Sequence, residues 1–155
     1  MNRVVEAGEI LKSFLQTVIP TATITRTYTP AARLDGIDLS TLQIFLTPED
    51  VRCDLETHNG RKFTDYVTYT IAIVQKVTDI SDPTTEVDGL LETVQTIRDS
   101  LIFQFHPATS NTLKLITTQA ENSSSRPLYD RGKLEDQNLF CSFLLVEVMV
   151  NGEKT

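Results

Sequence analysis

The sequence is poor in the residue types that carry catalytic and metal chemistry. Its 155 residues include two cysteines, two histidines and no tryptophan. Cys53 and Cys141 are too few for a disulfide framework, and their spacing to His58 and His106 matches no zinc-binding pattern. The six glycines form no phosphate-binding loop, and no serine or cysteine lies in a recognisable nucleophile motif. We therefore expect no catalytic site, no cofactor and no metal.

Basic clusters and long apolar runs are also missing. Fourteen Lys and Arg against 21 Asp and Glu give a net charge of −7, and the basic residues are scattered. Direct nucleic-acid recognition is not expected, because binding the phosphate backbone requires clustered cations. The longest apolar run, 143–150, is interrupted by Glu147 and is too short to cross a membrane. Charges at Glu6, Glu9 and Lys12 argue against a signal peptide, so synthesis in the cytoplasm is expected.

The length and the periodic segments predict one α+β domain over residues 1–155. A chain of this size buries about two-thirds of its unfolded surface without metals or disulfides. Apolar residues at helical spacing predict helices over 4–18 and 85–101, and Gly89 is expected to let the second helix approach the sheet closely. Alternating or β-branched runs predict strands over 21–29, 42–47, 63–77, 113–118 and 139–150, with Pro48 interrupting the chain after the second of them. Residues 119–138 are polar and predict a long loop, with one helical turn near Lys133.

A hairpin is predicted around Asn59-Gly60, because a two-residue type I′ turn needs positive φ at both positions. That register pairs His58 with Arg61, Cys53 with Tyr66 and Asp54 with Asp65. The last pair is a like-charge contact that a β-bulge near the tip would relieve. Odd positions from Phe63 to Val77 are mostly apolar and predict the core face. Both cysteines lie in predicted strands, where a small buried thiol is expected.

The predicted architecture is a mostly antiparallel sheet with helices packed on one face and a projecting β-hairpin, at about 50–66. The helix that carries Leu90, Leu91, Val94 and Ile97 is expected to cover the strand face of Val67, Tyr69, Ile71 and Ile73. The polar hairpin tip has two interpretations, an arm that docks on a neighbouring subunit or a solvated loop without a role.

The acidic run 79–88 allows a calcium loop or helix capping. An EF-hand that began at Asp79 would need glycine at position 84 and glutamate at 90, where the chain has Thr84 and Leu90. Asp82-Pro83 followed by a capping box of Thr85 and Asp88 predicts the start of a helix. Capping is therefore the favoured interpretation.

The order of the segments resembles the tail terminator, or tail completion, proteins of long-tailed bacteriophages. The resemblance spans about residues 4–150 and rests on TDYVTYTIAIVQKVTD, EVDGLLETVQTIRDSL, RPLYDRGKLEDQ and LFCSFLLVEVMV in succession. It implies a small α+β subunit that closes into a hexameric ring, caps the tail tube and presents a surface to the head-tail connector protein. It further implies a structural virion protein of the tail or neck, assembled in the host cytoplasm, whose partners are its own copies, the tail tube protein and the connector.

Two groups of residues are expected at subunit or partner interfaces. The hairpin contributes Glu56, His58, Asn59, Arg61 and Lys62, and the segment before the last strand contributes Arg126, Tyr129 and Arg131. Family members are similar in carrying a loop at 127–130. Local packing of Tyr129 within a turn is the alternative to contact with another protein.

Two other functions remain open. Another head-tail joining protein of the phage neck would have a similar size and acidity. A small cytoplasmic α+β enzyme or ligand-binding domain, with a site assembled from dispersed residues, belongs to a different class. A stable metabolite pocket would favour the latter, whereas concentration-dependent rings would favour assembly.

Overall fold

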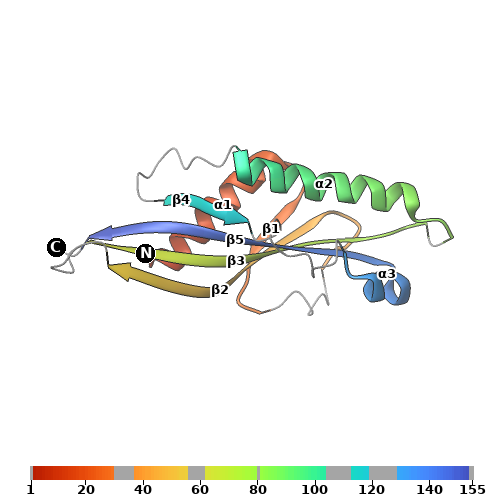
Figure 1. The fold of residues 1–155 in the computed structure, drawn as a ribbon. Coiled ribbons are helices and arrows are strands. Elements are labelled where there is room, and N and C mark those ends of the chain that lie inside the picture. Colours follow the sequence, from red (N-terminus) through yellow and green to blue (C-terminus); the bar gives the residue numbers. More distant parts are fainter. Residues whose placement is uncertain are drawn as a thin grey trace.

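A five-stranded mixed sheet organises the chain (Figure 1). The computed structural model describes residues 2–29, 37–55, 62–79, 81–103, 113–118 and 129–153. The elements are α1 (Arg3–Val18), β1 (Thr23–Arg26), β2 (Gln43–Leu55), β3 (Lys62–Lys76), α2 (Thr84–Phe103), β4 (Leu113–Thr118), α3 (Arg131–Gln137) and β5 (Leu139–Glu153). The spatial order is β1-β2-β3-β5-β4; β1 is parallel to β2, and every other neighbouring pair is antiparallel. The predicted α+β class is confirmed.

The helices α1 and α2 contact each other and lie on the same side of the sheet (Figure 1). Their apolar residues and the inward side chains of the strands form one hydrophobic cluster, which includes Leu11, Leu15, Ile71, Ile97 and Leu101. The face predicted for α2 is therefore correct. α1 lies mainly over β1, β2 and β3, whereas α2 makes its main sheet contacts with β4 and β5.

The opposite face of the sheet has a small core of its own. Phe45, Ala72, Val74, Leu139 and Cys141 are buried there beneath Ile37 and Leu39. The backbone N–H of Lys76 donates to the carbonyl of Leu39 at 2.8 Å, which fixes this covering segment to the end of β3. Further along the same face, Phe143 is 41% exposed. Among the described residues, Ile37 and Leu39 thus cover one end of the second face, and Thr64 is buried toward its other end.

Pro48 does not interrupt β2, contrary to the sequence prediction. The strand continues to Leu55, with Pro48 opposite Tyr69 and a shift in register between Pro48 and Asp50 that leaves Glu49 unpaired as a β-bulge. The carbonyl of Leu46 accepts from Thr27 at 2.9 Å, so even-numbered residues of this part of β2 direct their backbone groups toward β1. Pro48 therefore loses no bond to β3, which is why an edge strand tolerates it here.

The start of α2 and the segment before β5 differ from the predictions, whereas β4 and β5 agree with them. α2 begins at Thr84, so Thr85 and Asp88 lie inside it and form no capping box; Asp82 accepts from the Thr84 N–H instead, at 3.2 Å. The seven-residue helix α3 lies within the predicted loop 119–138, begins after the N-cap Asp130 and ends at Asn138, whose φ is 53°. β4 covers the predicted range, and β5 is a central strand, as its two apolar faces indicated.

Candidate interaction surface

The β2–β3 hairpin pairs in a register one residue away from the predicted one. Leu55 is opposite Phe63, and Cys53 is opposite Asp65, not Tyr66. An odd number of residues thus separates Leu55 from Phe63, whereas an uninterrupted ladder to a two-residue turn at Asn59-Gly60 requires an even number. Within the described part of the hairpin a bulge lies at Glu49, and the tip, where a bulge was predicted, lies outside the described residues. Asp54 faces Thr64 in this register, so the like-charge contact with Asp65 does not arise.

The hairpin is braced by other elements. β5 pairs with β3 along its whole length, from Lys76 opposite Leu139 to Lys62 opposite Glu153. At the start of α1, the Arg3 guanidinium lies 4.3 Å from the centre of the Phe63 ring and 3.5 Å from the Asp65 carboxylate. The ends of β2, β3 and β5 reach past the two helices in Figure 1. The described part of the hairpin is therefore held on one side by β5 and at Phe63 and Asp65 by Arg3.

Charged side chains cluster on the face of the hairpin that lies opposite the main core. The Arg52 guanidinium lies 4.1 Å from the centre of the Tyr66 ring and 2.8 Å from the Asp54 carboxylate. Cys53, on the other face, is exposed, contrary to the expected burial, whereas Cys141 is buried. A hydrogen bond to Asp65 raises the pKa of the Cys53 thiol, and desolvation raises that of Cys141. Neither thiol is activated as a nucleophile.

The predicted interface residues before β5 lie at the start of α3. Tyr129 stacks on Phe140, with ring centres 6.1 Å apart, and joins the edge of the main core. This is the local packing that the sequence left open as the alternative to a partner contact. Asp130 accepts from the Lys133 N–H at 3.1 Å, while Arg131 is exposed and pairs with Glu135 at 3.8 Å. Of these side chains, that of Arg131 is the most available to a partner.

Several predicted site residues fall outside the described residues, namely Glu56, His58, Asn59, Arg61 and Arg126. Lys62 is the first residue of β3, and only its backbone is described. The structure thus brings none of the described hairpin residues together with Tyr129 or Arg131. Sequence reasoning missed Arg3, Arg52 and Asp54, although the pattern V-R-C-D-L at 51–55 already showed an alternation of apolar and charged residues.

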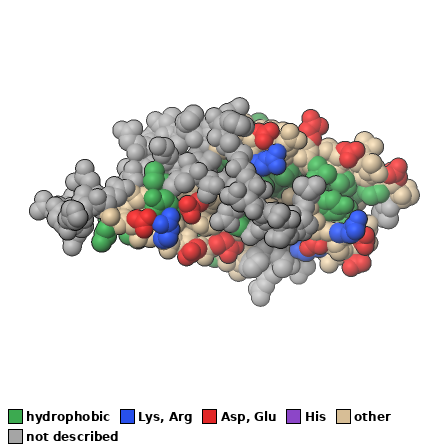
Figure 2. Space-filling view, viewed as in Figure 1, with side chains coloured by type: hydrophobic (Ala, Val, Ile, Leu, Met, Phe, Trp, Pro, Cys, Tyr) green, Lys and Arg blue, Asp and Glu red, His purple; other side chains and the backbone are tan. Residues whose placement is uncertain are grey.

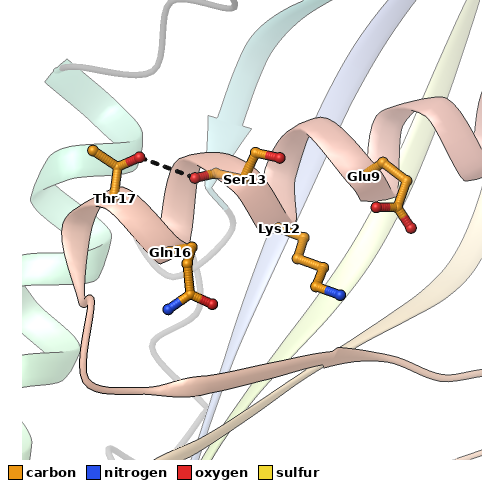
Figure 3. A pocket seen from close by; sticks show the side chains of 5 residues that line it. All are labelled: Glu9, Lys12, Ser13, Gln16 and Thr17. Carbon is orange, nitrogen blue, oxygen red and sulfur yellow. Dashed lines mark hydrogen bonds between the residues drawn. The ribbon is translucent and has the colours of Figure 1, made fainter.

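Two hollows on the surface are lined by described residues. One, of about 370 Å³, follows the polar face of α1 and is lined by Glu9, Lys12, Ser13, Gln16 and Thr17 (Figure 3). Most of these side chains serve local structure: Glu9 accepts from Arg26 at 2.8 Å, and Gln16 donates to the carbonyls of Pro20 and Ala22. The other, of about 350 Å³, lies between α3 and the start of α2, and its lining includes Asp79, Tyr129 and Arg131.

Within the described part of the chain, no group of three or more His, Cys, Asp or Glu side chains is arranged to hold a metal ion. No helix among the described residues is long and apolar enough to span a membrane. On the side shown in Figure 2, basic side chains stand singly among acidic ones, in line with the net charge of −7. His58 and His106 lie outside the described residues.

The carboxylate of Glu86 closes the connection between β3 and α2. It accepts from the Thr78 hydroxyl at 2.6 Å and from the backbone N–H groups of Thr78 and Asp79 at 2.9 and 2.8 Å. The Thr78 hydroxyl and these N–H groups hold the pKa of Glu86 below its ordinary value. Glu86 therefore fixes the connection that precedes α2 and does not cap a helix; of the acidic run 79–88, Asp82 accepts from the Thr84 N–H at the start of α2.

Glu86→Gln is expected to make the free energy of unfolding depend less on pH in the acid range. A carboxylate whose pKa is depressed by folding stabilises the folded state above its unfolded pKa of about 4.3, and this stabilisation is lost as the pH falls through the folded-state pKa. Urea unfolding at a series of pH values should show a variant that is less stable at pH 7 and loses less stability on acidification. Glu92→Gln, an exposed carboxylate on the same helix, is the matched control. Parallel profiles for Glu86→Gln and wild type would contradict the assignment.

Comparisons with known proteins add no relative. No protein-family model matches the chain, and no curated protein sequence matches it either.

Proposed function

We propose that the protein is a structural subunit of a bacteriophage tail, a tail terminator that closes into a ring at the end of the tail tube and contacts the head-tail connector. The observation that carries the proposal is the braced hairpin. β2, β3 and β5 continue past α1, and Leu55, at the end of β2, is 70% exposed. A rigid projection with an exposed apolar residue suits a heterologous contact, in which each subunit docks on the next.

The proposal is tested with tail tubes from a phage that lacks its terminator. Added protein should bind to one end of each tube as a ring, visible by electron microscopy, and should stop further lengthening. Binding to connectors but not to tube ends would instead identify another joining protein of the neck. If the protein binds neither, the proposal is wrong.

Shortening the hairpin tip is expected to weaken ring formation and leave the fold intact. Replacing residues 57–61 by Asn-Asp-Gly keeps an odd number of residues between Leu55 and Phe63, so the observed register is preserved. Stability should change by less than about 0.5 kcal/mol, because the change lies beyond the core. Sedimentation across a range of concentrations should show fewer rings, since one defect is repeated at every interface. Unchanged ring formation would make the tip a solvated loop.

A further inference from the structure

The outer edge of β2 is open beyond the end of β1. β1 pairs with β2 from Gln43 to Leu46, and the last bond between them runs from the Thr27 N–H to the Leu46 carbonyl. Among the described residues, nothing pairs with this edge from Pro48 to Leu55. A strand edge of this kind is a template for pairing with another chain.

The direction of the backbone groups along this edge follows from the register. Leu46 and Pro48 face outward, and after the bulge at Glu49 the residues that face β3 are Asp50, Arg52 and Asp54. The outward groups are therefore those of Val51, Cys53 and Leu55. An independent contact agrees, because the Val51 N–H donates to the Asp50 side chain at 2.8 Å and so is not part of the β2–β3 ladder.

The side chains of the open edge fall on two faces, with Val51, Cys53 and Leu55 on one and the charged Arg52 and Asp54 on the other. Val51, Cys53 and Leu55 lie on the same face of the sheet as the main core, but beyond it, and Val51 and Leu55 are 44% and 70% exposed. The Arg52 and Asp54 side chains, on the other face, are 56% and 49% exposed. The edge thus offers backbone groups that no described strand pairs with, an apolar face and an ion pair that solvent reaches.

This short strand is complementary to itself. If two copies of V-R-C-D-L are laid antiparallel about Cys53, Val51 faces Leu55 of the second copy, and Arg52 faces Asp54 of the second copy. The outward backbone groups also match, because Cys53 faces Cys53 and Val51 faces Leu55 as hydrogen-bonded pairs. For the second pair, the Val51 N–H exchanges the Asp50 side chain for the Leu55 carbonyl of the second copy. Every cross-strand pair is then either apolar or of opposite charge, apart from the central cysteines, and these are the kinds of pair that stabilise a sheet.

We propose that residues 51–55 of β2 pair with the same residues of a second copy of this chain, which joins two sheets across a two-fold axis. The pairing is limited in the same way at both ends, where Asp50 of one copy, next to Pro48 and the bulge at Glu49, would face Glu56 of the other copy, a like-charge pair. A contact of five residues is small, so the dimer is weak and reversible. It is isologous, whereas a ring contact is heterologous, and it does not depend on the proposed function.

Charge reversal provides the decisive test, measured by sedimentation velocity across a range of concentrations. Arg52→Asp and Asp54→Arg should each dimerise roughly tenfold more weakly than wild type, because each places like charges opposite one another twice. Mixing the two variants should restore association, since positions 52 and 54 of one variant then face residues of opposite charge in the other. The double variant Arg52→Asp/Asp54→Arg should self-associate like wild type. Circular dichroism checks that each variant is folded.

Proximity of the two Cys53 side chains gives a second readout. A short bismaleimide at about pH 8 should link two wild-type chains, while Cys53→Ser should remove the product, because Cys141 is buried. Single variants that dimerise like wild type, or a mixture that fails to associate, would overturn the proposal. A wild-type protein that stays monomeric at all concentrations would do the same. Association without the Cys53 product would show that another interface is used, and would also overturn the proposal.

Discussion

Ile97→Ala is expected to lower the free energy of unfolding by about 2–5 kcal/mol. Ile97 is fully buried on α2 and belongs to the cluster that joins both helices to the sheet. Truncation removes apolar contacts and leaves a cavity that the surrounding strands fill only in part. Urea unfolding at neutral pH measures the loss directly.

Two variants on the same helix provide a comparison for the loss of stability expected of Ile97→Ala. Leu91 is only partly buried against the cluster, so Leu91→Ala should cost less than Ile97→Ala. Gln95 is exposed, and Gln95→Ala should stay within about 0.5 kcal/mol of wild type. Equal losses for Ile97→Ala and Leu91→Ala would show that α2 is rotated about its axis relative to this structure.

Gly8→Ala is expected to destabilise the protein by about 1–3 kcal/mol, although alanine is the better helix former by about 1 kcal/mol. A Cβ at Gly8 would lie 2.5 Å from the Tyr69 hydroxyl oxygen and 2.6 Å from Cδ of Arg26. The Arg26 side chain is flexible, but Tyr69 is fully buried and donates its hydroxyl to the Val4 carbonyl. Burial raises the pKa of Tyr69 to about 12, so the phenol keeps this proton at neutral pH.

The clash with Tyr69 can be separated from other effects by a double-mutant cycle. In a Tyr69→Phe background the nearest oxygen is gone, so Gly8→Ala should cost about 1 kcal/mol less than in wild type. Gly89→Ala is the matched control, since a Cβ there meets nothing within 4 Å, and it should stabilise α2 by about 1 kcal/mol. Additive effects of the Gly8 and Tyr69 changes would contradict the proposed contact. The expectation that Gly89 allows close approach to the sheet is wrong, because that residue is exposed.

The elements that the sequence predicted well are those whose pattern is local and long. α1 and α2 have apolar residues at helical spacing over several turns, and β5 is apolar on both faces because it lies between β3 and β4. The helix α3 has only seven residues and depends on its caps, Asp130 and Asn138, so periodicity gave no more than a helical turn there. Length and repetition therefore decided which elements could be predicted.

The hairpin register could not be predicted, because a turn motif is only one of the contacts that set it. β5 pairs with β3 over fifteen residues, and Arg3 of α1 fixes Phe63 and Asp65 from a distant part of the sequence. These contacts set the register of the described part of the hairpin, whatever turn the tip adopts. The same reasoning applies to the candidate surface, since the exposure of Cys53 and the open edge of β2 depend on where β1 ends.

The position of β5 in the sheet has a consequence during synthesis on the ribosome. β3 pairs with β5 along its full length, yet α2, β4 and α3 are translated between the two strands. A nascent chain that has just completed β3 can form the β2–β3 hairpin, but the other side of β3 has no partner until β5 emerges. Folding of this sheet is therefore expected to finish late, and the growing chain is a substrate for chaperones that shield unpaired strands.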